Sequence, residues 1–154
     1  MLPFMWAAED KNACSVAGEL VDGTSVFTIS GGPILVKTMV SVCITANGAT
    51  ATTLQWKLYP TVGTATTFSG ATATLASATA GTTIRLNNLS LAAAPSIVAA
   101  SSGGIQIGQS VPNEIILPAG EIRMVVGVGS STGTWKHYIR YSPMGPACII
   151  SNGA

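Results

Sequence analysis

Residues 129–143 read GSSTGTWKHYIRYSP. It contains a hydrolase-like pattern, G-x-S-x-G at 129–133, followed by a run of alternating residues, so it bears both on catalysis and on the type of fold. A nucleophile elbow requires a strand, a sharp turn and then a helix, and the residues after Gly133 have the period of two that is typical of a strand. One face of this predicted strand carries Trp135, His137, Ile139 and Tyr141. We therefore interpret Gly129–Gly133 as the loop of a β-hairpin rather than as part of an active site.

The same period of two extends outward from this stretch to three other segments. In ILVKTMVSVCIT, residues 34–45, the predicted inward face carries Ile34, Val36, Val40, Val42 and Ile44. In residues 52–60 the predicted inward face carries Leu54, Trp56 and Leu58. In residues 121–128 it carries Ile122, Met124, Val126 and Val128. Asn47 and Gly48 tolerate a positive φ and predict a turn between two of these strands. Short strands with turns between them indicate an all-β fold, an antiparallel β-sandwich or jelly roll.

The chain divides into an N-terminal segment and one larger domain. Its 154 residues fit a single domain with a sizeable core. We expect residues 1–22 to form an arm or edge segment and residues 23–154 a single β-sandwich domain. Short strands are predicted in the Ala- and Thr-rich residues 62–86, and a helical turn before Pro95. The arm contains large apolar side chains that we expect at a protein interface, namely Leu2, Phe4, Met5 and Trp6.

The charge content is the most informative number in the composition. Charged residues are 8% of the chain, against roughly 25% in an average soluble domain. A surface built from Thr, Ser, Ala and Gly suits burial against other subunits. A net charge of +1 without a basic cluster predicts no nucleic-acid binding, and no apolar run reaches the ~20 residues that span a bilayer. The cysteines, with no metal-binding spacing, are expected to be reduced and buried: Cys14, Cys43 and Cys148.

We find no residue set that predicts catalysis, a cofactor or a metal. The single histidine, His137, has no second histidine with which to bind a metal, although Ser131, His137 and Asp22 remain a possible triad in space. Glu114 and Glu121 are a weak candidate for a glycosidase pair, since each lies beside a turn where an exposed charge is ordinary. We expect no enzyme and a structural role for the histidine.

The aromatic residues allow a second interpretation. Four of them, Trp56, Tyr59, Trp135 and Tyr138, would suit a platform on which sugars stack. The two tryptophans lie on predicted inward faces, so core packing is the interpretation that the pattern favours.

Taken together, three segments resemble a known class of proteins. These are LYPTVGTATTFSGATATLASATAGTTI, the strand ending LPAGEIRM, and TGTWKHYIRYSPMGPACI after a glycine-rich turn. In composition and turn style, over residues 36–150, the chain resembles the small β-sandwich virion proteins of tailed bacteriophages, and more narrowly capsid cement or decoration proteins. That class has no functional residue motif to transfer.

The resemblance implies a non-enzymatic structural protein that is made in the bacterial cytoplasm and sits on the outside of the capsid. Such a protein binds the major capsid protein, often as a homotrimer or homodimer, and bridges neighbouring capsomers. No nucleic acid and no membrane is implied as a partner. The alternative is a head-fibre or tail adhesin module that binds a host-surface glycan, with Trp56, Tyr59 or Tyr138 exposed.

Overall fold

The computed structural model describes residues 9–86, 93–105, 115–129 and 132–153. This part of the chain consists of strands and loops with one short 3₁₀ helix, η1, at Ala100–Ser102. The strands are β1 (Lys11–Cys14), β2 (Gly18–Glu19), β3 (Ser25–Ser30), β4 (Ile34–Thr45), β5 (Thr53–Pro60), β6 (Thr66–Thr67), β7 (Thr83–Arg85), β8 (Ser96–Val98), β9 (Ile115–Leu117), β10 (Gly120–Gly127), β11 (Thr134–Pro143) and β12 (Ile149–Asn152).

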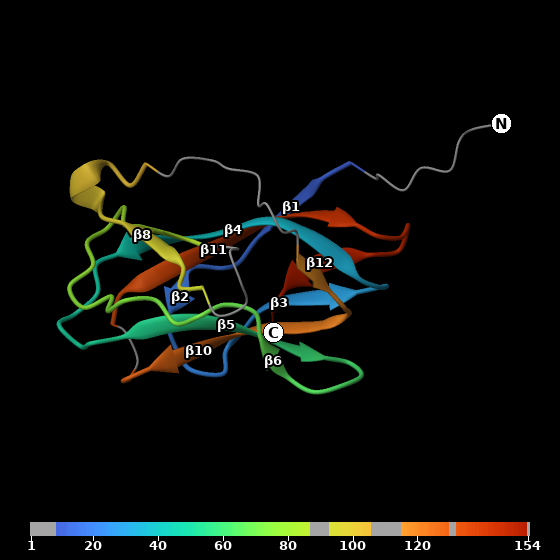
Figure 1. Cartoon of the computed structure of the whole chain (residues 1–154). Helices are drawn as coiled ribbons and strands as arrows, with labels where there is room; N and C mark the ends of the chain where they lie inside the picture. Colours follow the sequence, from blue (N-terminus) through green and yellow to red (C-terminus); the bar gives the residue numbers. More distant parts are fainter. Residues whose placement is uncertain (1–8, 87–92, 106–114, 130–131, 154) are drawn as a thin grey trace.

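The strands form two antiparallel sheets that pack face to face (Figure 1). The seven-stranded sheet has the order β1-β11-β4-β7-β8, with β2 also pairing with β11 and β9 also pairing with β4. The five-stranded sheet has the order β12-β3-β10-β5-β6. The protein is therefore an all-β antiparallel sandwich, as the strand pattern predicts.

The core lies between the two sheets and is built from alternate residues of each strand. From the seven-stranded sheet, Trp135 and Ile139 are buried, and from the five-stranded sheet Trp56, Phe27 and Ile122. Full burial of one such side chain contributes roughly 1.5–3 kcal/mol, so these alternating positions supply most of the driving force for closing the sandwich. The inward faces predicted for β5 and β11 are confirmed.

The inward face predicted for β4 is wrong after its third residue. Tyr141 pairs with Val36 and Arg140 with Thr38, so Lys37 is an extra residue opposite β11, a β-bulge. Because side chains alternate with a period of two, one extra residue exchanges the two faces of the strand. Beyond the bulge the buried residues are Met39, Ser41 and Cys43, whereas Val40, Val42 and Ile44 lie on the outer face.

The interpretation of Gly129–Gly133 as a hairpin loop is also wrong. β10 pairs with β3 and β5, whereas β11 pairs with β1, β2 and β4, so the two strands on either side of this segment belong to different sheets. Trp135 and Ile122 do both point inward, but they face the core from opposite sheets. A strand rather than a helix follows Gly133, which agrees with the rejection of a nucleophile elbow.

The Ala- and Thr-rich segment is mostly irregular, with only β6 and β7 as short strands. Its hydroxyl groups instead accept hydrogen bonds from the backbone of β5: Ser69 Oγ from Trp56 N–H at 3.1 Å, and Thr72 Oγ1 from Leu54 N–H at 3.0 Å. Side chains thus satisfy backbone donors that a neighbouring strand would otherwise satisfy. A helical turn is found after Pro95 rather than before it, at η1, while residues 87–92 lie outside the described chain.

The N-terminal segment is tied to the sandwich where it is described. β1 pairs with β11 at the edge of the seven-stranded sheet, and the Asp10 carboxylate forms an ion pair of 2.9 Å with Arg140. Cys14 on this edge strand is exposed, unlike the buried Cys43 and Cys148, so the expectation of three buried thiols is wrong for Cys14. Burial raises the pKa of the Cys43 thiol.

Asn47 links the loop after β4 to the core. Trp135 Nε1–H donates to Asn47 Oδ1 at 2.8 Å, and Asn47 Nδ2–H donates to the carbonyl of Leu75 at 2.9 Å. The side chain is buried, and its φ is not positive, so Asn47 is present for these two hydrogen bonds rather than for a turn conformation. A Cβ added at Gly133 would overlap Asn47 Oδ1, which explains the glycine next to Trp135.

We expect Asn47→Ala to lower the free energy of unfolding by about 1–3 kcal/mol, because it leaves the buried indole N–H of Trp135 without a partner and removes one of the hydrogen bonds to the Leu75 carbonyl. Urea denaturation followed by tryptophan fluorescence measures this loss. The control is Asn12→Ala on the exposed face of β1, which should change stability by no more than ~0.5 kcal/mol. Equal effects of the two substitutions would contradict the role given to Asn47.

Candidate functional site

His137 lies in the core and forms a buried pair with Ser41. A hydrogen bond of 2.6 Å joins Ser41 Oγ and His137 Nδ1, and the two residues are directly opposite each other in β4 and β11. The backbone of His137 also exchanges hydrogen bonds with Ser15. Ser41 and His137 are 0% and 3% exposed, so neither is available to a substrate.

The environment of His137 favours the neutral imidazole. Desolvation by burial lowers its pKa from 6.5 to about 4. The adjoining hollow, lined by Ser15, Trp135 and Met124 among others, measures about 60 Å³, far below the ~300 Å³ of the smallest usual ligand pockets. His137 is thus a hydrogen-bonded structural residue in this fold.

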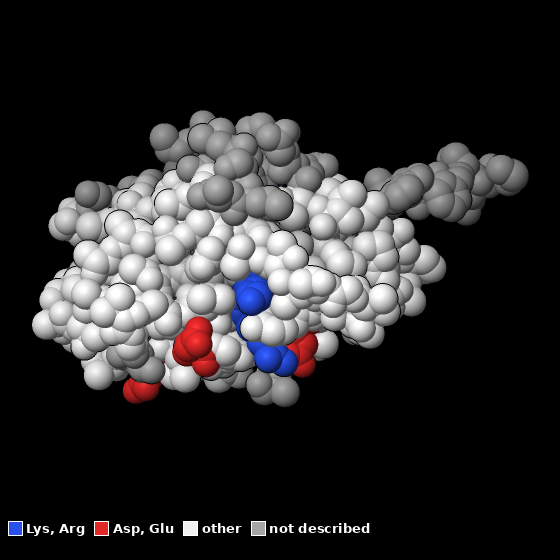
Figure 2. All heavy atoms as spheres, turned by 60° about the horizontal axis from the view of Figure 1, so that its bottom comes forward, with Lys and Arg blue, Asp and Glu red and all other residues white. Residues whose placement is uncertain are grey.

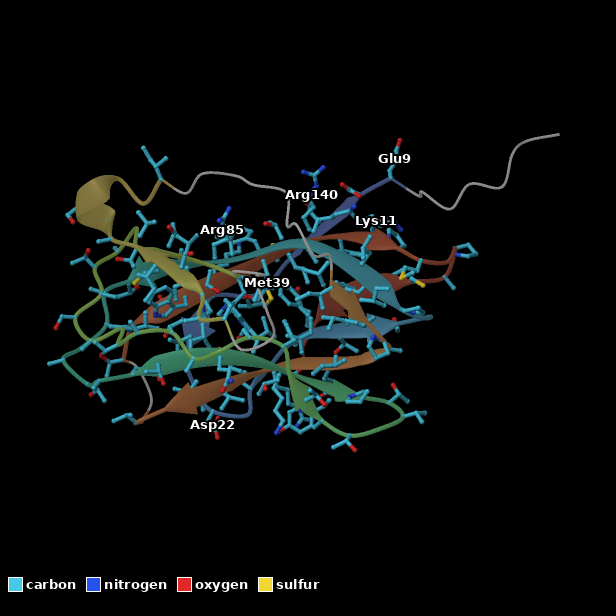
Figure 3. All side chains as sticks on the ribbon, viewed as in Figure 1. Glu9, Lys11, Asp22, Met39, Arg85 and Arg140 are labelled. Carbon is cyan, nitrogen blue, oxygen red and sulfur yellow. The ribbon has the colours of Figure 1, made fainter. Side chains whose placement is uncertain are left out.

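The triad considered from sequence is not assembled in the described residues. Asp22 accepts a 2.9 Å hydrogen bond from the N–H of Val126, and Figure 3 places it on the far side of the molecule from Arg140. The Nδ1 atom that a triad carboxylate would orient is occupied by Ser41. Ser131 lies outside the described residues.

Of the two carboxylates considered from sequence as a glycosidase pair, only one lies in the described residues. Glu121 forms a 2.6 Å ion pair with Arg123, whereas Glu114 lies outside the described residues. Within the described ranges, no group of three His, Cys, Asp or Glu side chains is placed to hold a metal ion.

The four aromatic side chains that would make a sugar platform are separated in space. Trp56 and Trp135 are fully buried, as core packing predicts. Tyr59 lies on the outer face of the five-stranded sheet, and Arg123 and Lys57 cover its ring, at 4.4 Å and 5.2 Å from the centroid. Tyr138 lies on the opposite face of the sandwich, beside Lys136. No shared stacking surface results.

The outer face of the five-stranded sheet is polar. A broad hollow of about 570 Å³ there is lined by hydroxyl, aromatic and charged side chains, including Thr28, Ser30, Tyr59, Glu121 and Arg123. Figure 2 shows this side, with a few charged side chains near its middle and uncharged residues around them. Glu121 neutralises Arg123, and the cations of Lys57 and Arg123 both contact the ring of Tyr59. The charges on this face therefore largely satisfy one another.

The outer face of the seven-stranded sheet is different, because the bulge at Lys37 turns aliphatic residues outward. We call this surface the apolar face and define it by Val40, Val42, Ile44 and Tyr138. Val40 pairs with Tyr138, and the two valines are half-buried, while Ile44 and Tyr138 are 47% and 39% exposed. Large side chains left half in water on a sheet face are typical of a docking surface.

Cations flank the apolar face. Val40 lies beside Arg85 in β7, and Val42 lies beside Lys136 in β11. Arg85 and Arg140 both point away from the seven-stranded sheet, whereas Met39, which follows the bulge, lies between the sheets (Figure 3). An apolar centre with charged side chains at its margin has the anatomy of a protein interface.

A second apolar surface lies where the edges of the two sheets meet. It is a groove of about 290 Å³ between the β5–β6 turn and β9, and we call it the edge groove. Val62 and Ile116 in its wall are 89% and 57% exposed. All of its lining residues are uncharged, among them Leu58, Pro60, Phe68 and Leu117.

The arm residues expected at an interface, Leu2, Phe4, Met5 and Trp6, lie outside the described residues. In the described part of the chain, no helix has the length and apolar character needed to cross a membrane. Comparisons with protein-family models, curated proteins and solved structures gave no match. The function is therefore inferred from the surfaces of the molecule.

The buried histidine makes folding sensitive to acid. Because its pKa is about 4 in the folded chain and near 6.5 in the unfolded chain, only the unfolded chain gains the proton between these values. The stabilising effect of a neutral His137 is thus complete above pH 6.5 and is lost as the pH falls toward 4. At pH 4.5 we expect a loss of roughly 2–3 kcal/mol relative to pH 7 from this group.

Urea denaturation at pH 7 and pH 4.5 tests this expectation, with His137→Gln as the variant that cannot titrate. The difference in unfolding free energy between the two pH values should be smaller in the variant by the roughly 2–3 kcal/mol expected from His137. The same pH dependence in both proteins would show that His137 is not the responsible group.

Proposed function

We propose that this protein is a non-enzymatic structural component of a bacteriophage virion, a capsid cement or decoration protein that binds the outer surface of the major capsid shell. The single observation that carries the proposal is the apolar face of the seven-stranded sheet. Its exposed Ile44 and Tyr138, flanked by Lys136, suit adhesion to another protein, and the low charge content of the chain and its resemblance to decoration proteins support the same conclusion.

The mechanism is adhesion by buried apolar area. An interface of standard size buries about 800 Å² on each partner, and the apolar share contributes ~25 cal/mol per Å² before the costs of ordering. A subunit that contacts two capsomers, or an oligomer that contacts several, makes the later contacts intramolecular and gains avidity. Many modest contacts of this kind would reinforce the shell against internal pressure.

The structure gives less support to a glycan-binding adhesin. A stacking site needs an open aromatic ring, and Tyr59 is covered by Arg123 and Lys57. Tyr138 keeps a partly exposed ring beside Lys136, within the apolar face. A single tyrosine among aliphatic side chains is more typical of a protein interface than of a sugar site.

We expect Ile44→Asp to weaken binding to the shell by about tenfold or more, because it places a carboxylate within an apolar contact. The measurement is co-sedimentation of the purified protein with empty shells assembled from the major capsid protein alone. The matched control is Ile149→Asp on β12, since Ile149 has nearly the same exposure, 46% against 47%, but belongs to the five-stranded sheet.

Retained binding of Ile149→Asp together with loss for Ile44→Asp would support both the function and the surface. Equal binding of the two variants and the unaltered protein would exclude the apolar face as the contact. Failure of the unaltered protein to bind shells at any concentration would overturn the proposed function itself.

A further inference from the structure

The edge groove has the features of a receptor for an extended peptide. β6 is the last strand of the five-stranded sheet, and β9 pairs, among the described strands, with β4 alone. The groove therefore lies beside backbone edges that can accept another strand, and its wall provides apolar side chains. Val62 at 89% exposure and Ile116 at 57% are left in water unless something covers them.

We propose that the edge groove binds the N-terminal segment of a second copy of this chain, residues 1–8, MLPFMWAA. This inference goes beyond shell binding and does not depend on it. The segment matches the groove in chemistry, because no side chain in it is charged and no lining residue of the groove is charged. Leu2, Phe4 and Trp6 also alternate, so a strand would present all three on one side.

The position of the single proline is compatible with such a strand. Pro3 falls between Leu2 and Phe4, at the alternate position. In a strand that pairs along one edge through residues 2, 4 and 6, the missing N–H of Pro3 faces away from the pairing edge. Peptides are commonly recognised in this way: the backbone adds a strand to a sheet edge, and alternate side chains enter pockets.

The position at which the described chain begins favours another copy as the source of the segment. Lys11 lies beside Tyr141, Tyr141 beside Val36, and Val36 beside Ile115 of β9. These three steps span roughly 14 Å at ~4.8 Å per strand, and the groove lies beyond β9, toward β6.

From Asp10 to Trp6, the reach of the chain's own arm only equals the path to β9. Asp10 is held on β11 by its ion pair with Arg140. The four residues from Asp10 to Trp6 span at most about 14 Å when fully extended, which brings Trp6 only as far as β9, one wall of the groove. To place Trp6 deeper in the groove, toward β6, the same chain would need more length than this, whereas a second copy has no such limit. Exchange of arms between copies closes into an oligomer.

Molar-mass measurement by light scattering after size-exclusion chromatography tests the proposal, using the full chain and three altered forms. Val62→Asp places a charge in the groove, and a chain that begins at Glu9 lacks the arm. The control is Val128→Asp, which alters an apolar residue of 73% exposure outside the groove. We expect an oligomer for the full chain and for Val128→Asp, and about tenfold or more weaker association for the other two forms.

A mixing experiment separates arm exchange from other causes of association. Val62→Asp has an intact arm and a blocked groove, and the chain that begins at Glu9 has an intact groove and no arm. Neither should self-associate, but the two mixed should form a complex through one arm and one groove. Circular dichroism establishes that each form is folded.

A monomeric full chain, or an unchanged oligomer after removal of the arm, would overturn the proposal. The proposal also fails if Val62→Asp keeps its oligomeric mass but loses binding to capsid shells, since the groove would then bind the shell. Because Ile44→Asp leaves the groove intact, a failure of shell binding in that variant is distinguishable from a failure of arm exchange.

Discussion

Two residues of β4, Lys37 and Ile44, have no counterpart in β11, and the one at Lys37 determines what each side of the seven-stranded sheet presents. Lys37 has no counterpart in β11, so the residues after it exchange faces. The strand then brings Ser41 into the core and leaves Val40, Val42 and Ile44 outside. A buried hydroxyl costs free energy unless it is hydrogen-bonded, and His137 provides the partner. The buried Ser41–His137 pair and the exposed apolar face are thus two consequences of the same bulge.

The bulge also coincides with a change of neighbour along one edge of β4. Before Lys37 the strand pairs with β9, through Ile34–Val36, and after it with β7, through Val40–Val42. The apolar face is therefore bordered by β7 and its arginine, while β9 is left at the edge where the groove forms.

The sequence predicts the alternation of β5 and β11 correctly, because the inward residues of each strand follow one another without interruption. It does not predict the bulge, because Val40, Val42 and Ile44 continue the alternation of Ile34 and Val36 with no sign in the sequence of an extra residue. It misplaces Gly129–Gly133, since local residues encode a turn but not the distant strands that β10 and β11 pair with. The candidate surfaces could not be predicted for the same reason, because both depend on contacts between distant segments. The apolar face requires the bulge, and the edge groove joins residues 60–68 with residues 115–118 only when the two sheets pack.

The three surfaces of the sandwich point in different directions, so each could take a separate part in the assembly proposed above. The apolar face covers one sheet, the polar face with Lys57, Glu121 and Arg123 covers the other, and the edge groove lies at the side. In the proposed assembly the first faces the capsid, the second faces water, and the third receives a neighbouring copy. Contacts made sideways hold several apolar faces at fixed positions, so that each subunit already bound raises the effective concentration of the next. In this proposed assembly a chain with so few charges would stay soluble, because partners would cover its apolar surfaces and its polar sheet would remain outside.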